Sequence, residues 1–225
     1  MLLLLGLVAA ASGLHIPEHP LVLGREILDR ELQFAPVNPL NGAAFDQCNT
    51  VNFNYCQAKY SERLGLDPSV NWRQAEVNGE YSWNWRSQFY QCLGAQYYNC
   101  VSLYNLYNKA NSDAEIASAQ LYVYAMRADD FTCNEGFEEG VNAYECLLNV
   151  LSIPEYAQCR SQFNTSIVTH DVPFCDAVAT MGSCYNNAYA IACPRDPHGA
   201  GWFGCEMHRQ AYIDICQPGK RCFVH

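Results

Sequence analysis

Apolar residues recur every three or four positions along most of the chain from residue 45 onward, which is the spacing of one face of an α-helix. Few segments alternate apolar and polar residues, and valine and isoleucine are scarce. The pattern therefore predicts an all-α fold of about seven helices. The clearest stripe lies in residues 82–108 and consists of Phe89, Leu93, Tyr97, Cys100, Tyr104 and Tyr107.

Turn and capping residues divide this pattern into helices. A first helix is predicted over residues 45–64, and Asp67-Pro68 opens a short one that ends near residue 78. A third helix covers residues 82–108. The apolar face of the first helix is expected to hold Phe45, Cys48, Val51, Tyr55, Cys56, Tyr60 and Leu64.

A hydroxyl residue followed three positions later by Glu is a capping-box signal, and it occurs at Ser112, Thr132 and Ser152. Helices that begin at these residues are expected to end near residues 128, 151 and 163. The remaining segments are predicted as a loop over 164–172, a helix over 173–192, a Pro-Gly loop over 194–201 and a last helix over 202–216.

Thirteen cysteines are spread along the chain without any C-x-C, C-C or C-x-x-C pair. Zinc sites, iron–sulfur clusters and dithiol redox centres need such close pairs, so wide spacing favours structural disulfides. The twelve cysteines assigned to disulfides are Cys48, Cys56, Cys92, Cys100, Cys133, Cys146, Cys159, Cys175, Cys184, Cys193, Cys205 and Cys216.

Helix geometry restricts the pairing of the first four cysteines. Cys48 and Cys56 are eight residues apart, which is about 12 Å of helical rise, so they cannot bond to each other. Cys92 and Cys100 have the same spacing. Two antiparallel helices would join them as a two-rung ladder, Cys48 to Cys100 and Cys56 to Cys92. A parallel register, or partners elsewhere in the domain, stay open as alternatives.

One cysteine is left over by parity. Four cysteines lie in the amino-terminal helices and eight lie between Cys133 and Cys216, so Cys222 is the expected unpaired residue. An unpaired cysteine in an oxidising compartment can link two chains into a disulfide-bonded homodimer. The alternative is that Cys222 pairs within the domain and another cysteine is the spare.

The amino terminus indicates export. Residues 2–11 are an apolar run too short to span a bilayer, followed by small residues, which predicts a signal peptide over residues 1–13. Residues 14–43 hold four prolines and no cysteine and are expected to be an extended leader outside the core. Residues 44–222 then form the cysteine-rich helical domain. We expect a secreted, extracellular protein.

The charge balance narrows the partners. The chain has 13 basic and 23 acidic residues, a net charge of −10. Proteins that bind polyanions need clustered cations, so nucleic acid and anionic membranes are not expected as partners.

Three segments of the second half carry a resemblance. They are CNEGFEEGVNAYECLLNVLSIPEYAQC from Cys133, FCDAVATMGSCYNNAYAIAC from Phe174 and WFGCEMHRQAYIDIC from Trp202. Their cysteine and aromatic spacing resembles nematode secreted, cysteine-rich helical domains of unknown function and their chondroitin-proteoglycan-like relatives. The resemblance implies a non-enzymatic extracellular protein. Chondroitin attachment needs Ser-Gly, and that pair occurs only in the signal segment.

A hydrolase is a weaker interpretation. Cys205-x-x-His208, preceded by HGAGWFG, is similar to the calcium loop and catalytic histidine of secreted phospholipases A2. Those enzymes need an Asp directly after the histidine to bind calcium, and this chain has Arg209 there. His15 and His19 are the one pair of histidines four residues apart, and Pro17 between them disfavours the helix that an H-x-x-x-H metal site needs. We expect no catalytic residues, metal or cofactor.

Two features bear on binding and modification. The aromatic helix could line a pocket for a small apolar ligand with Trp85, Tyr97 and Tyr104, although helix packing explains the same stripe. Asn164-Thr165-Ser166 is the only N-x-S/T sequon, so Asn164 is the expected N-glycosylation site. The function expected is extracellular binding of another protein or a structural role, with a carrier of a small apolar ligand as the alternative.

Overall fold

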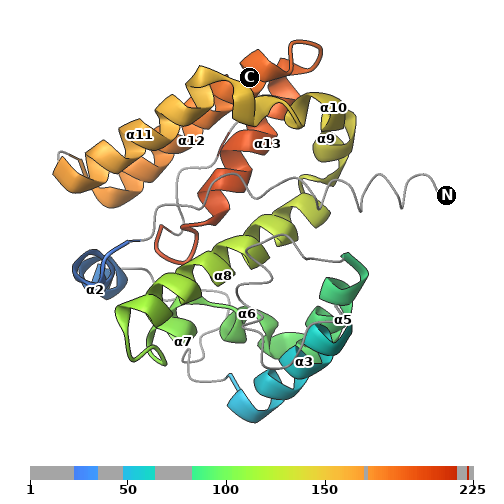
Figure 1. Cartoon of the computed structure of the whole chain (residues 1–225), viewed down its shortest axis with the longest axis vertical. Coiled ribbons are helices and arrows are strands. Elements are labelled where there is room, and N and C mark those ends of the chain that lie inside the picture. The colour runs from blue at the N-terminus through green and yellow to red at the C-terminus, as the bar shows by residue number, and fades with distance from the viewer. Residues whose placement is uncertain (1–22, 35–47, 64–82, 170–171, 217–221, 223–225) are drawn as a thin grey trace. The chain divides into compact units, whose positions relative to one another are not determined.

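The computed structural model describes residues 23–34, 48–63, 83–169, 172–216 and Cys222, and every regular element in these ranges is helical (Figure 1). The predicted all-α, disulfide-stapled fold is confirmed, with more helices than the seven expected. The signal segment and the short helix at Asp67 lie outside the described residues. The α-helices are α2 (Arg25–Phe34), α3 (Thr50–Arg63), α5 (Trp83–Leu93), α6 (Tyr97–Cys100), α7 (Leu103–Tyr107), α8 (Asp113–Cys133), α9 (Phe137–Asn142), α10 (Tyr144–Leu147), α11 (Pro154–Thr169), α12 (Phe174–Ala192) and α13 (Pro197–Gln210). Two 3-10 turns are η2 (Gly94–Gln96) and η3 (Val150–Ser152).

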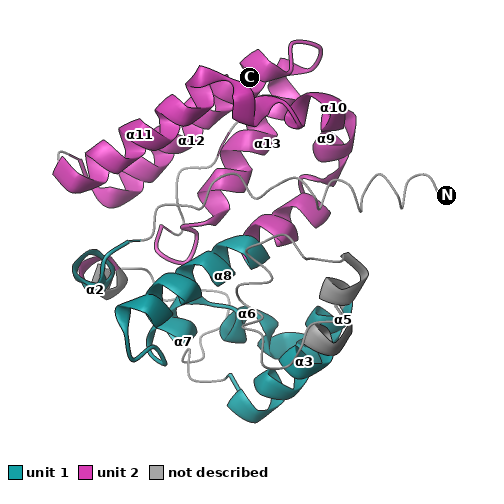
Figure 2. Cartoon of the chain, in the orientation of Figure 1, with its two compact units in different colours: residues 1–29, 37–126 teal, residues 30–36, 127–225 magenta. Residues whose placement is uncertain are grey.

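The chain divides into two compact units (Figure 2). Unit 1 holds residues 1–29 and 37–126, and unit 2 holds residues 30–36 and 127–225. The boundaries therefore fall inside α2 and inside α8, and the stretch expected as one domain is divided after residue 126.

In unit 1, α3 and α5 lie side by side (Figure 1) and are joined by Cys56–Cys92, and a second disulfide joins Cys48, just before α3, to Cys100 of α6. Cys48 bonds to Cys100 with Cα atoms 4.8 Å apart, and Cys56 bonds to Cys92 with Cα atoms 5.8 Å apart. The antiparallel ladder predicted from equal cysteine spacing is confirmed.

The apolar face predicted for α3 is wrong in part. Val51 and Tyr55 are exposed, by 80% and 58%, whereas Phe53, Cys56 and Gln57 are buried. The disulfide decides this orientation, because Cys56 must face α5 and the residues three before and one after it turn inward with it.

The predicted single helix over residues 82–108 is wrong, because the chain breaks at Gly94. Gly94 has a φ of +53°, a left-handed conformation that glycine adopts without a Cβ clash, and it ends α5. A second break at Val101 separates α6 from α7, where the Ser102 hydroxyl accepts a hydrogen bond from the Asn105 N–H. The first four residues of the stripe are nevertheless buried: Phe89, Leu93, Tyr97 and Cys100.

The expectation of an extended leader outside the core is wrong for residues 23–34. Arg25–Phe34 form α2, with Gly24 accepting the first backbone hydrogen bonds from Ile27 and Leu28. Leu23 and Leu28 are buried. The rest of residues 14–43 lies outside the described ranges.

Unit 2 is built on α11, α12 and α13. Helices α11 and α12 lie side by side (Figure 1), and Cys159–Cys184 joins them. Helix α13 packs closely on α12 because glycines face it: a Cβ on Gly204 would lie 2.3 Å from Cγ of the Tyr189 ring, and one on Gly201 would lie 2.9 Å from the Asn186 carbonyl oxygen.

Three boundaries in unit 2 differ from the sequence expectations. Thr132 lies inside α8 and begins no helix, and the predicted helix after it is divided into α9, α10 and η3. The predicted loop over 164–172 is wrong, since α11 continues to Thr169. The predicted Pro-Gly loop is right for residues 194–196 and wrong from Pro197 onward: the Asp196 side chain caps α13 by accepting from the Gly199 N–H at 3.1 Å, with Pro197 in the first turn.

Candidate functional site

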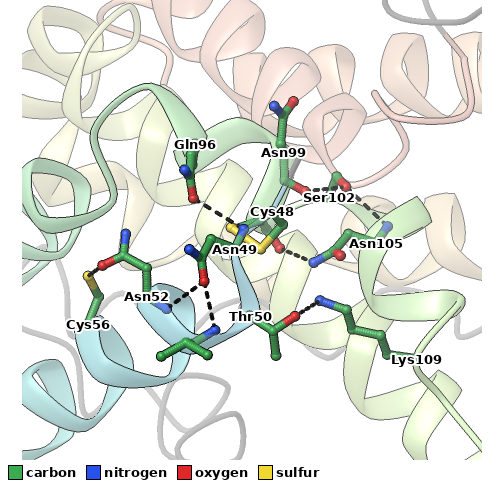
Figure 3. The surroundings of a disulfide bond; sticks show 12 residues. Cys48, Asn49, Thr50, Asn52, Cys56, Gln96, Asn99, Ser102, Asn105 and Lys109 are labelled. Carbon is green, nitrogen blue, oxygen red and sulfur yellow. Dashed lines mark hydrogen bonds between the residues drawn. A yellow bond between two sulfur atoms is a disulfide. The ribbon is translucent and has the colours of Figure 1, made fainter. Parts of the chain in front are cut away.

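Polar side chains surround the Cys48–Cys100 disulfide of unit 1 (Figure 3). Asn49 follows Cys48 and caps α3, because its Oδ1 accepts from the N–H groups of Val51 and Asn52 at 3.0 and 3.1 Å. Its own N–H donates to Gln96 Oε1 at 3.2 Å. The cluster thus ties the start of α3 to η2.

The other side of the same disulfide is held by α7 and the turn before it. Asn105 is buried and its Nδ2 donates to the Cys100 carbonyl oxygen at 3.0 Å (Figure 3). Lys109 Nζ donates to Thr50 Oγ1 at 3.1 Å, and burial lowers the Lys109 pKa. These polar groups satisfy backbone ends around the disulfide, so the arrangement supports the fold and holds no aligned nucleophile and base.

The aromatic side chains of α5 and α6 pack against one another. Tyr97 has no exposed surface, and its ring centre lies 4.8 Å from Tyr90, 5.2 Å from Tyr98 and 6.1 Å from Phe89. Tyr97 is therefore a core residue, as the packing interpretation expects. Tyr104 is half-buried, and the side chain of the third predicted pocket residue, Trp85, is outside the described set.

The expectation that Cys222 is the unpaired cysteine is wrong. Cys222 bonds to Cys205 of α13, and its backbone N–H donates to the Glu206 carboxylate at 2.9 Å. The six disulfides leave out Cys133, which is half-buried at the end of α8. The even count of cysteines between Cys133 and Cys216 misled, because Cys205 pairs with Cys222 and not with a cysteine of that group. The expected homodimer linked through Cys222 is therefore not supported. The other disulfides of unit 2 are Cys146–Cys193, Cys159–Cys184 and Cys175–Cys216.

His208 lies in a cage of tyrosines in unit 2. Its ring stacks on Tyr185 with centres 3.6 Å apart and planes 10° apart, and Nε2 lies 3.4 Å from the Tyr189 hydroxyl oxygen. Tyr156 adds a third ring at 5.7 Å. The side chain is only 6% exposed, and burial lowers the pKa of His208 to about 3. The imidazole is therefore neutral at physiological pH.

Arg209, the residue that replaces a calcium ligand in the phospholipase comparison, is neutralised locally. Its Nε and Nη2 both donate to Glu206 Oε2, at 3.0 and 2.7 Å, and the Glu206 side chain is buried. Because the other Glu206 oxygen accepts from the Cys222 N–H, this carboxylate contacts both Cys222 and Arg209. The residues around His208 are therefore used in packing and ion pairing.

The end of α8 carries a second perturbed group. Burial and the negative charge of Glu135 raise the pKa of Asp130 to about 8. Asp130 is therefore largely protonated at neutral pH. Its backbone carbonyl accepts from Asn134 Nδ2 at 2.6 Å, which closes the end of the helix.

The sequon lies in a helix rather than in the predicted loop. Asn164 is half-buried on α11, and its Oδ1 is enclosed without a hydrogen-bond partner. The hydroxyls of Thr165 and Ser166 donate to carbonyl oxygens one turn earlier, at 3.0 and 3.1 Å. Glycosylation of Asn164 stays a prediction.

Within the described part of the chain, no three His, Cys, Asp or Glu side chains are placed to hold a metal ion. None of the described helices is long and apolar enough to cross a membrane. Comparisons with protein-family models, with curated proteins and with solved structures found no match to this chain. The resemblance to nematode cysteine-rich domains therefore stays a prediction.

Proposed function

We propose that this chain is a secreted protein that acts outside the cell by binding or as a structural component, without catalysis of its own. The observation that carries the proposal is the distribution of six disulfides, two in unit 1 and four in unit 2. Disulfides in such number persist in oxidising compartments, and both units would need them to stay folded after export.

Binding is supported by apolar side chains on the surface of unit 1. Val51 and Tyr55 are one helical turn apart on α3 and both are exposed, and Tyr90 and Tyr98 are also exposed, by 40% and 45%. Tyrosine is enriched in protein interfaces because it offers apolar area with a polar tip. The carrier alternative has less support, since Tyr97 is enclosed by other rings.

Secretion is tested by expressing the full chain in a eukaryotic secretory host. We expect the protein in the medium with residues 1–13 removed, six disulfides by non-reducing peptide mapping, and a glycosidase-sensitive mass shift that Asn164→Gln abolishes. The same protein should not hydrolyse phospholipid or ester substrates above a His208→Ala control. Reduced protein retained inside the cell, or a rate that depends on His208, would contradict the proposal.

A further inference from the structure

The leader is held on unit 1 by an unusual contact to its backbone. The Leu23 N–H donates to Gln120 Oε1 at 2.8 Å, and Gln120 Nε2 donates to the Leu23 carbonyl oxygen at 2.9 Å. Both residues are buried. One side-chain amide thus satisfies both backbone groups of a single residue, as a neighbouring peptide strand would. Such a contact recognises a main chain, which is a property of peptide-binding sites.

Two further contacts fix the direction of the leader. Arg25 Nε lies 3.2 Å from Asp113 Oδ1, and the Tyr107 hydroxyl donates to Asp29. Partial burial and the bond to Asp29 raise the pKa of Tyr107. As residue numbers rise along the leader, the partners run backward along α8 and then α7. The contacts therefore specify one orientation of the bound segment.

The apolar contacts outweigh the charged ones. Leu23 and Leu28 are 2% and 0% exposed, whereas the side chains of Arg25 and Asp113 are 45% and 87% exposed. An ion pair in water contributes little to affinity, but burial of two leucines contributes strongly. The bound segment is therefore defined by its two leucines and by the backbone at the first of them.

No disulfide reinforces this contact. The first cysteine of the chain is Cys48, so all crosslinks lie beyond the leader. Residues 23–29 can leave unit 1 without reduction of any bond, while Cys48–Cys100 and Cys56–Cys92 stay closed. The leader thus has the covalent relation to unit 1 of a tethered peptide.

We propose that the surface formed by Tyr107, Asp113 and Gln120 is a peptide-binding site and that the leader is its resident, exchangeable ligand. The ligand class is an amphipathic peptide with an apolar residue whose backbone pairs with Gln120, an arginine two residues later and a leucine five residues later. The site gives the proposed binding function a ligand class, and the inference rests on that proposed function. The leader then competes with any other such peptide.

The test uses the full chain with a specific protease site placed between residues 35 and 47 and cut after folding. A fluorescent peptide of residues 20–34 is titrated into cut and uncut protein by anisotropy. A short tether gives the resident leader an effective concentration of about 1 mM. We therefore expect the labelled peptide to bind the cut protein at least tenfold more tightly than the uncut protein.

Two peptide variants isolate the contact without altering the protein. N-methylation at Leu23 removes the N–H that Gln120 accepts and should weaken binding at least tenfold, whereas Glu26→Gln changes an exposed residue and should bind like the parent peptide. Peptide mapping of the cut protein checks that all six disulfides remain. No binding to the cut protein, or equal binding of the N-methyl peptide, would overturn the site. Neither result depends on secretion, so failure here is distinct from failure of the proposed function.

Discussion

The buried neutral histidine predicts how the stability of unit 2 responds to acid. In the unfolded chain His208 takes up a proton near pH 6.5, but in the folded protein it does so only near pH 3. Between these values the unfolded state binds one more proton at this residue, so the folding free energy due to His208 falls as the pH falls. Its contribution is intact above pH 6.5.

The magnitude follows from the width of that window. From pH 6.5 to pH 4.5 the penalty grows by about 1.4 kcal/mol per pH unit, so it reaches about 3 kcal/mol at pH 4.5. Asp130 acts in the opposite direction. Its folded pKa of about 8 lies above the unfolded value of 3.8, so the folded state holds the extra proton and gains stability as the pH falls from 8 toward 4. The two effects nearly cancel between pH 6.5 and pH 4 in the native sequence.

Variants separate the two groups. His208→Phe keeps a ring against Tyr185 but cannot be protonated, and His208→Gln gives a second uncharged replacement. Urea unfolding of both variants and of the native protein is followed by circular dichroism at pH 7 and pH 4.5. Whatever each variant loses at pH 7, its stability relative to the native protein should rise by about 3 kcal/mol at pH 4.5. A relative stability that stays constant within about 0.5 kcal/mol would refute the buried neutral imidazole.

Two further predictions concern packing and crosslinks. Gly204→Ala should destabilise the protein by about 2 kcal/mol in thermal unfolding, because the new Cβ would lie 2.3 Å from Cγ of Tyr189 and α12 and α13 would have to separate. The control Gly140→Ala should cost much less, because its Cβ would approach Cε2 of Phe203 only to 3.0 Å. Removing either rung of the ladder, by serine at both cysteines of Cys56–Cys92 or at both of the other pair, should cost about 3 kcal/mol by guanidinium unfolding. The two losses should be equal. When one disulfide is intact, forming the other closes the same ring, made of residues 48–56 and 92–100 and about 18 residues in size. Losses that differ by more than about 1 kcal/mol between the two disulfides would contradict this.

Local spacing predicted the parts of the fold that local geometry determines. The ladder followed from two equal intervals of eight residues, because a helix converts an interval into a distance. The capping signal at Ser112 is also confirmed: the Glu115 N–H donates to its hydroxyl at 3.3 Å, and α8 begins one residue later. The stripe of residues 82–108 predicted the buried side chains as far as Cys100, but beyond the break at Val101 the buried residues are Leu103, Asn105 and Leu106 while Tyr104 and Tyr107 are half-buried.

Local composition gave wrong predictions at two places where a single residue decides the backbone conformation. Asp-Pro was interpreted as a helix start at Asp67, but the same pair at Asp196 was taken as part of a Pro-Gly loop. In the structure the Asp196 carboxylate caps α13, and Gly201, one of the glycines that favoured a loop, is needed inside the helix because Asn186 of α12 lies too close for a side chain. The prediction at Gly94 was wrong in the opposite direction: a continuous helix was expected where this glycine ends α5. The apolar spacing does not mark a residue with positive φ.

Long-range pairing was beyond the sequence for a different reason. Cys222 bonds to Cys205 over Gly182 of α12, where a Cβ would lie 3.0 Å from the Cys205 sulfur and 3.8 Å from that of Cys222. That disulfide needs a glycine on a third segment to make room for it, a condition that counting cysteines cannot express. The leader is the same kind of case: Leu23 and Leu28 are five residues apart and form no helical stripe, and Leu23 is paired with Gln120, 97 residues away in the chain. Local sequence patterns do not predict contacts between residues that are far apart in the chain. Such contacts, including those of the proposed peptide site, therefore have to be tested by experiments on both partners.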